Sequence, residues 1–207
     1  MFDTLRWTGI EWQEGPADAT DFEARWSNRC RMGLYEKVLE HVAAAGLVYA
    51  CAKSRKDLEP FGGDYPKTFR EQGLSLDTPG CAWRVRTPDY LPLQDFVVRR
   101  RDGLPAYQIA SVADDIFFGI THLVRGADLS ASSAAQRWLA ETLLPFSTPD
   151  FDYKVFLKAS IRHHPLLLDE AGRKLSKSAG SASLHAWRTA GKGAGEIWDY
   201  AARLLEV

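Results

Sequence analysis

The segment from Pro92 to Leu129 constrains the fold of this chain most, because it combines a strand pattern, a helix pattern and a second strand pattern. Residues 96–98 are β-formers, and three arginines and an Asp102-Gly103 turn follow them. Apolar residues then recur at spacings of three and four, which predicts a helix that ends at Gly119. Residues 120–124 predict a buried strand, so the order indicates a βαβ unit and an α/β fold.

A short polar stretch, residues 125–128, follows the second predicted strand at its carboxyl end. Open α/β sheets place their ligands at such ends. The guanidinium of Arg125 would present a planar fork of donors to a carboxylate there. The same arginine also fits an internal ion pair to Asp115 or Asp128, and the residues alone favour that pair over a ligand contact.

Composition indicates an ordinary soluble globular chain, with 45% hydrophobic and 26% charged residues. The net charge of −1 provides no general attraction to nucleic acid, so any such contact would need a local patch. Cys30, Cys51 and Cys81 are odd in number and widely spaced, which fits neither a disulfide framework nor a zinc signature. There is no apolar run of membrane-span length and no signal-peptide pattern, and we therefore expect a cytoplasmic protein.

Helix and strand patterns also occur outside the central segment. Residues 25–46 and 132–144 predict amphipathic helices, and residues 83–86 alternate as a strand does. Residues 153–168 carry apolar runs that predict a strand entering a buried loop. Residues 184–205 predict one or two closing helices with a glycine-rich interruption.

Two motifs make the chain similar to a known family. The sequences RRDGLPAYQIASVADD and GITHLVRGADL, at residues 100–115 and 119–129, are followed by KLSKS at residues 174–178. In this order they resemble the catalytic domain of class I glutamyl-tRNA synthetases, closest to the short glutamyl-Q tRNA(Asp) synthetase branch. The resemblance covers most of the chain. It implies a Rossmann-type α/β core over residues 1–50 and 91–207, with a small inserted α/β subdomain over residues 51–90.

The resemblance also implies an activity, which is the ATP-dependent activation of glutamate with Mg²⁺ and its transfer to tRNA. Tyr107 and Arg125 match the family residues that bind glutamate. The KLSKS motif (Lys174, Leu175, Ser176, Lys177, Ser178) matches the ATP-binding loop, with Lys177 as the principal contact and Lys174 as the second catalytic lysine. Two lysines on such a loop can stabilise the charge that develops on the phosphates. The non-functional alternatives are that Tyr107 is a core aromatic and that the KLSKS motif is part of the solvated surface.

The inserted subdomain of the family contacts the acceptor end of tRNA, and in many members it binds zinc through cysteines that begin near Cys51. Lys53 stands where a second cysteine would be, and a later cysteine is missing, so we expect no zinc. For residues 51–90 of this chain, two interpretations are open: the segment contacts a tRNA end, or it is a surface insertion without a partner. The cluster Arg99-Arg100-Arg101 is open in the same way, because it fits either a phosphate contact or a solvated face.

The largest departure from the family lies in the N-terminal part of the catalytic domain. The first strand, the HIGH motif and the second strand have no counterpart in this sequence, although HIGH supplies half of the ATP site. We therefore keep an alternative, which is a truncated, catalytically inactive paralogue that binds glutamate, an adenylate or a tRNA end, or an interaction module. Two acceptors are open, the tRNA acceptor end and an anticodon-region base. Self-association or a partner chain would cover the sheet edge that the missing strands expose.

Overall fold

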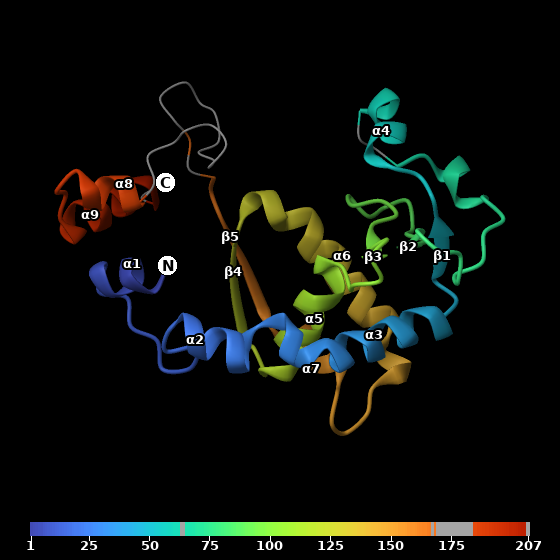
Figure 1. The fold of residues 1–207 in the computed structure, drawn as a ribbon, viewed down its shortest axis with the longest axis horizontal. Helices are drawn as coiled ribbons and strands as arrows, with labels where there is room; N and C mark the ends of the chain where they lie inside the picture. Colours follow the sequence, from blue (N-terminus) through green and yellow to red (C-terminus); the bar gives the residue numbers. More distant parts are fainter. Residues whose placement is uncertain (63–64, 167, 169–183, 206–207) are drawn as a thin grey trace. The chain divides into compact units, whose positions relative to one another are not determined.

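The computed structural model describes residues 1–62, 65–166, 168 and 184–205, and the chain divides into two compact units. The smaller unit joins Met1–Cys30 to His163–Val207, and the larger unit is Arg31–Arg162 (Figure 1). The partition predicted from the family, with an insertion at 51–90, follows other boundaries and stays a prediction. None of the described helices is long and apolar enough to cross a membrane.

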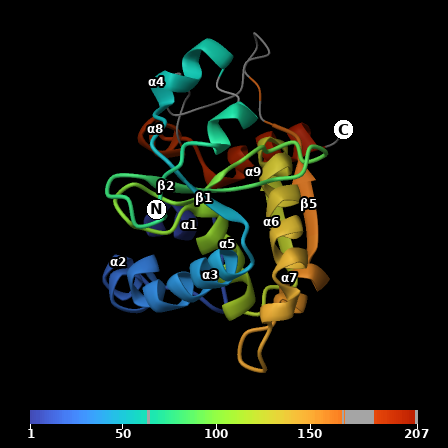
Figure 2. The same cartoon turned by 90° about the vertical axis from the view of Figure 1, so that its right-hand side faces the viewer.

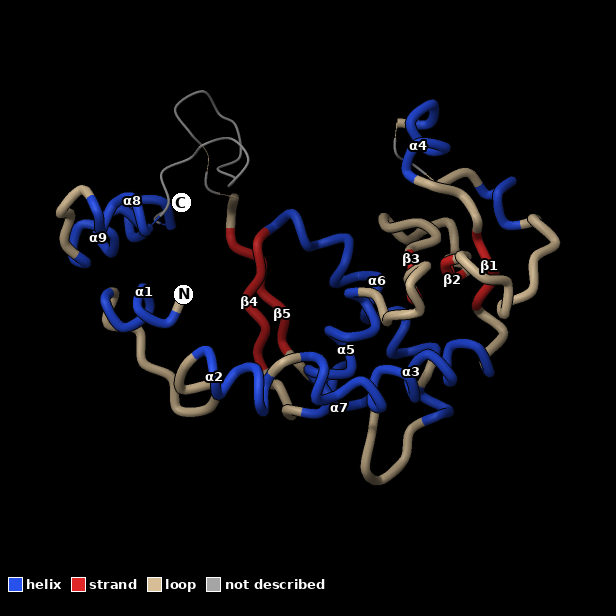
Figure 3. Tube along the Cα trace, viewed as in Figure 1, coloured by secondary structure: helices blue, strands red, loops and turns tan. Residues whose placement is uncertain are grey.

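The larger unit contains a three-stranded antiparallel sheet in the order β1-β2-β3 (Figure 3). Strand β1 is Val48–Cys51, β2 is Ala82–Val85 and β3 is Val97–Arg99. The register pairs Val48 with Val85 and Cys51 with Ala82, so the predicted strand near residues 83–86 is confirmed.

A second sheet has two strands, β4 (His122–Gly126) and β5 (Ser160–His164), which run parallel. The βαβ prediction for the central segment is wrong, because β3 pairs with β2 and not with β4. The helical crossover instead joins β4 to β5 through α6 (Ser130–Thr142) and α7 (Tyr153–Lys158). Strand β4 is also less buried than predicted, since His122 and Val124 are exposed and Arg125 is its one buried residue.

The core of the larger unit lies where α5 (Tyr107–Phe117) packs against α3 (Met32–Ala44), α6 and α7 (Figure 2). The predicted spacing of the α5 helix is confirmed, with Ile109, Val112 and Ala113 all fully buried. Each large side chain buried this way contributes about 1.5–3 kcal/mol.

Helix α3 starts later than predicted, at Met32. Residues 25–46 do not form one helix, because Ser27 is extended, with ψ of 152°. Two short helical segments precede α3, Phe22–Trp26 with π geometry and Asn28–Arg31 with 3₁₀ geometry. Residues 153–168 likewise begin as the helix α7, and the predicted strand is confined to β5.

The described part of the smaller unit contains the end of β5, the short helical segments that precede α3, and four α-helices: α1 (Phe2–Trp7), α2 (Ala19–Asp21), α8 (Leu184–Thr189) and α9 (Ala194–Leu205). The two closing helices and their interruption are as predicted. They are tied to the start of the chain by the indole of Trp198, whose Nε1 donates to the carbonyl of Thr8 at 2.8 Å.

The segment between β1 and β3 carries α4 (Arg55–Leu58) and a short 3₁₀ helix at Lys67–Arg70. One buried carboxylate, that of Asp95, accepts hydrogen bonds from β1 and from this segment. Asp95 is 1% exposed and accepts two hydrogen bonds from Arg70, at 2.6 and 2.7 Å. Tyr49 Oη and the backbone N–H of Thr87 donate to the same carboxylate, at 2.7 and 3.1 Å. Burial alone would raise the pKa of Asp95, but these donors hold it below its usual value.

We expect Asp95→Asn to lower the free energy of unfolding by about 3 kcal/mol, because it leaves the Arg70 guanidinium without its buried partner. A carboxylate with a depressed pKa stabilises the fold above its unfolded pKa and loses this contribution as pH falls through its folded pKa. Urea unfolding below about pH 4 should therefore show a weaker acid dependence in the variant than in the wild type. Asp89→Asn is the matched control, since Asp89 is 83% exposed and its surface pair with Lys67 should be worth less than about 1 kcal/mol. Equal losses in both variants would contradict the prediction.

Candidate functional site

Arg125 lies near the carboxyl end of β4, as predicted, and is 9% exposed. Its Nη1 donates to Gln136 Oε1 at 2.6 Å and to Ser133 Oγ at 3.1 Å. Its Nη2 donates to Ser111 Oγ at 3.2 Å and to Asp115 Oδ2 at 3.2 Å. The ion pair with Asp115 that the residues left open is therefore present.

Helical spacing explains how these acceptors gather. Ser111 and Asp115 are four residues apart on α5, so both lie on one face of that helix, and both contact Arg125. Tyr107 lies one turn earlier on the same face and is 51% exposed. Tyr107 is therefore the exposed member of the helical face that also carries Ser111 and Asp115. It is not the buried core aromatic that the sequence left open as an alternative.

A second layer of side chains orients the first. Gln136 is fully buried, and its Nε2 donates to Gln108 Oε1 at 2.8 Å. Gln108 in turn donates to Ser132 Oγ at 3.0 Å. Because an amide has one acceptor end and one donor end, the bond to Gln108 directs the oxygen of Gln136 at Arg125.

Two adjacent carboxylates on α5 serve different partners. Asp114 accepts from Arg31 at 2.7 Å and from Tyr35 Oη at 2.7 Å, whereas Asp115 faces Arg125. Neighbouring helical residues point about 100° apart, so such a division is expected. Burial raises the pKa of Asp115 to about 6, because it outweighs the lowering effect of Arg125.

The arrangement can bind a carboxylate. A buried guanidinium with two nitrogens on one edge is a bidentate site for a planar anion. Both nitrogens already contact neutral hydroxyls, and a ligand carboxylate could replace these weaker acceptors. The predicted ATP loop, Lys174 to Ser178, lies outside the described residues, and among those described no cluster of three or more His, Cys, Asp or Glu side chains could hold a metal ion.

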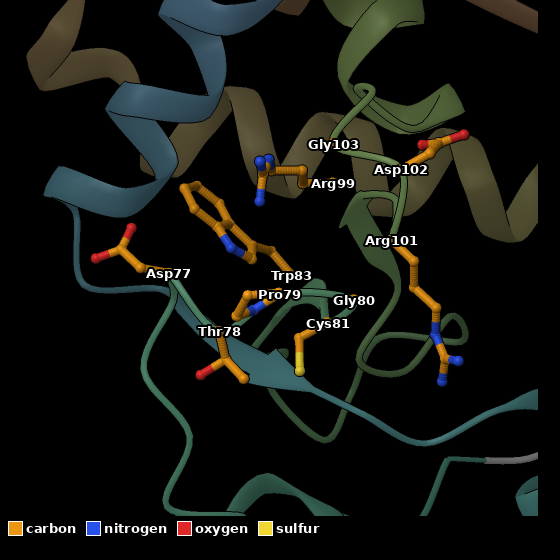
Figure 4. Close-up of a pocket in the computed structure, with 10 residues that line it drawn as sticks. All are labelled: Asp77, Thr78, Pro79, Gly80, Cys81, Trp83, Arg99, Arg101, Asp102 and Gly103. Carbon is orange, nitrogen blue, oxygen red and sulfur yellow. The ribbon is translucent and has the colours of Figure 1, made fainter.

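The larger unit also contains a pocket of about 500 Å³ beside the three-stranded sheet (Figure 4). The guanidinium of Arg99 lies over the indole of Trp83, with 4.9 Å between Cζ and the ring centroid. Gly103 has φ of 84°, and a Cβ there would be only 3.3 Å from Arg99 Nη2. A glycine therefore allows the turn to approach the arginine. The pocket is lined by residues of β2, β3 and two loops: Asp77, Thr78, Pro79, Gly80, Cys81, Trp83, Arg99, Arg101, Asp102 and Gly103.

The arginine cluster is thus divided among three tasks. Arg99 faces the pocket, whereas Arg100 pairs with Asp102 at the surface, at 2.6 Å. Arg101 donates to the carbonyl of Ala52, and in Figure 4 its side chain extends away from Arg99. The cluster is neither a uniform phosphate site nor a uniform solvated face.

The sequence interpretation offered Asp115 as a partner of Arg125 but missed the three other side chains that hold it, Ser111, Ser133 and Gln136. Ser111 carried a signal, since it lies four residues after Tyr107 and four before Asp115. Gln136 carried a weaker one, as a polar residue between the apolar positions Ala135 and Leu139 of one helix.

We expect the ionisation of Asp115 to make stability depend on pH between about 4 and 6. A carboxyl whose pKa is raised on folding stabilises the fold fully below its unfolded pKa, near 3.9, and loses this contribution as pH rises through about 6. Asp115→Asn cannot ionise and should flatten this part of the curve, as measured by urea unfolding at closely spaced pH values. Asp89→Asn should retain the wild-type slope, and an unchanged slope in Asp115→Asn would refute the assignment.

Comparison with known proteins agrees with these motifs. Residues 83–193 match the family model described as "tRNA synthetases class I (E and Q), catalytic domain". The glutamyl-Q tRNA(Asp) synthetase of Pseudomonas paraeruginosa is 36% identical over 205 residues, which is 92% of this chain and 63% of that protein. The corresponding protein of Cupriavidus metallidurans is 38% identical over 203 residues, 80% of this chain and 60% of that one. The chain thus spans somewhat under two thirds of the length of these relatives.

The fold has a counterpart among solved structures. The glutamate-tRNA synthetase of Elizabethkingia anophelis matches with a TM-score of 0.60 and 22% identity, over 86% of this chain and 42% of that chain. At this identity the likeness concerns the fold alone. The family model and the curated relatives identify the chain as a member of the class I glutamyl- and glutaminyl-tRNA synthetase family. It has the Rossmann-type α/β fold of that family's catalytic domain.

Proposed function

We propose that this chain forms the amino-acid and tRNA-end part of an enzyme that activates glutamate with ATP and transfers it to tRNA, in the manner of glutamyl-Q tRNA(Asp) synthetases. The observation that carries the proposal is the buried fork of Arg125, held at a strand end by α5 and α6. The identity of 36–38% to proteins of that name supports the substrate class.

Glutamate fits the site by charge and geometry. One of its carboxylates would meet the Nη edge of Arg125, in place of the hydroxyl of Ser111. Tyr107, half exposed at the start of the same helical face, would contact the substrate from the open side. The buried layer of Gln136 and Gln108 keeps the guanidinium in place, so little reorganisation is needed when the ligand binds.

Activation would proceed by attack of the glutamate α-carboxylate on the α-phosphorus of ATP, with pyrophosphate leaving and glutamyl-adenylate formed. Charge develops on the leaving phosphates, and the lysines of the KLSKS motif, Lys177 first and Lys174 second, would stabilise it. Mg²⁺, bound mainly by the substrate phosphates, would neutralise the same charge. A tRNA hydroxyl would then attack the carbonyl carbon of the adenylate and release AMP.

The pocket beside the three-stranded sheet is suited to the single-stranded end of a tRNA. Single strands bind by backbone contact with cations and by stacking of bases on aromatic rings. Arg99 supplies a cation and Trp83 an aromatic surface within one pocket of about 500 Å³. We propose this pocket as the acceptor-end contact.

Glutamate-dependent exchange between ATP and pyrophosphate is the reaction that tests this proposal. Lys177→Ala should lower the exchange rate by about a hundredfold or more, since it removes a preorganised cation from the leaving group. Arg125→Lys should act mainly on the glutamate KM, because it replaces a two-point contact by a one-point contact. The assay would be run with and without bulk tRNA.

Lys154→Ala is the control for the lysine, since Lys154 is exposed on α7. Exchange that survives both site substitutions would contradict the assignment of the residues. Absence of exchange from a folded wild-type chain that still binds glutamate in calorimetry would favour the alternative, a binding module without turnover.

The pocket is tested by two neighbouring arginines of equal charge. Arg99→Gln should weaken the binding of unacylated tRNA by about tenfold, because it removes a cation from the pocket together with its contact to Trp83. Arg100→Gln should change binding by less than about twofold, although it removes the same charge, since Arg100 is held at the surface by Asp102. Fluorescence anisotropy at a fixed salt concentration compares the two. Equal effects of both substitutions would mean that only general charge is sensed.

A further inference from the structure

Two stretches of the larger unit, residues 51–53 and residues 65–72, are fastened together by side chains. Cys51 is fully buried, and its Sγ lies 3.1 Å from Tyr65 Oη. Lys53 lies just beyond β1, and its Nζ is 4.6 Å from the ring centroid of Phe69. The four side chains thus converge from two chain segments onto one small cluster, which we call the 51–69 cluster: Cys51, Lys53, Tyr65 and Phe69.

Tyr65 is the centre of the 51–69 cluster. Its ring is 7% exposed, meets Phe69 edge to face at a centroid distance of 5.8 Å, and is covered by the guanidinium of Arg84 at 4.1 Å. Its hydroxyl donates to the carbonyl of Phe69 at 3.2 Å. Polar and apolar contacts therefore meet on a single ring.

Gln72 completes the connection between the two stretches. Its Oε1 accepts from the backbone N–H of Ala52 at 3.0 Å, and its Nε2 donates to the carbonyl of Phe69 at 2.6 Å. One amide thus bridges the backbone after β1 to the backbone of the 3₁₀ helix. Side-chain amides often bond backbone groups that have no partner in a helix or sheet, and Gln72 does so here.

The family implies zinc at this place, and the residues present do not fit it. Zinc requires about four nitrogen, sulfur or oxygen ligands in a tetrahedron. The 51–69 cluster offers one thiol and one phenol, but its other two members are an ammonium group and a benzene ring. The ammonium would repel a divalent cation at this distance.

We infer that the 51–69 cluster, together with Gln72, holds residues 51–53 against residues 65–72 without a metal ion. The Cys51–Tyr65 hydrogen bond, the Lys53–Phe69 cation–π contact and the Gln72 bridge all link residues 51–53 to residues 65–72. The cation–π contact attracts Lys53 of the first stretch to Phe69 of the second without a metal ion. This inference is independent of the proposed enzymatic function.

The inference predicts that a metal site can be installed by two substitutions. Lys53→Cys/Phe69→Cys places three thiols and the Tyr65 hydroxyl around one point and removes the repelling cation. We expect this variant to bind Co²⁺ with thiolate absorption, at least about a hundredfold tighter than the wild type, and to gain thermal stability with Zn²⁺. Burial raises the pKa of the Cys51 thiol, but its hydrogen-bond contacts with Tyr65 and Gln72 bring the pKa below its ordinary value, which favours the thiolate that a metal needs.

Two matched variants control this test. Lys53→Ser/Phe69→Ser has similar side-chain volumes without the thiols and should bind no Co²⁺. Adding Cys51→Ser to the double-cysteine variant should weaken Co²⁺ binding at least about tenfold, since it removes one ligand. A double-cysteine variant that is folded by circular dichroism but binds Co²⁺ no better than the serine control would show that these four side chains do not converge on one point, and would overturn the inference.

Cysteine labelling of the wild-type protein tests directly whether the 51–69 cluster is held together without a metal, even if the double variant does not fold. Alkylation of Cys51, followed by peptide mapping with the buried Cys81 as internal reference, reports opening of the cluster. We expect the same slow rate with and without a strong chelator, and a several-fold faster rate in Tyr65→Phe. Stoichiometric zinc in the purified protein, or faster Cys51 labelling on chelation, would overturn the inference.

Discussion

The burial of the Arg125 guanidinium between α5 and α6 is the interaction on which the candidate site depends. A buried charge without partners costs several kcal/mol, so the two helices must supply acceptors where the strand ends. Ser111 and Asp115 do so from α5, and Ser133 and Gln136 do so from α6. The register of both helices against β4 is therefore specified by polar contacts as well as by the apolar core.

The same physical device recurs at two other places in the larger unit. Arg31 holds Asp114 at the start of α3, and Arg70 holds Asp95 where the chain returns to β3. Each pair joins segments that are far apart in sequence, and breaking any of them would leave a buried charge. At the 51–69 cluster, where a charge pair is absent, a cation over an aromatic ring and an amide bridge act instead.

Local patterns predicted the helices well and the sheets poorly. Helix α5 and the closing helices follow from apolar spacing and glycine positions, both of which are local properties. The pairing of β3 with β2 could not be derived in this way, because a strand pattern states that a segment is extended and not which segment lies beside it. The exposure of Val124 escaped prediction for a related reason, since a run of β-formers predicts burial only if both faces of its sheet are covered.

By itself, the sequence determined the family, the helical segments and the position of Arg125 at the end of a strand, since each depends on residue order within a short window. Only the tertiary structure decided which acceptors hold that arginine. It also decided that Arg99 faces a pocket while Arg100 does not, and that Lys53 lies over Phe69. These contacts join residues whose separation along the chain carries no periodic signal. They arise when the apolar faces of the helices and sheet are buried, because that burial brings polar side chains together and leaves them to satisfy one another.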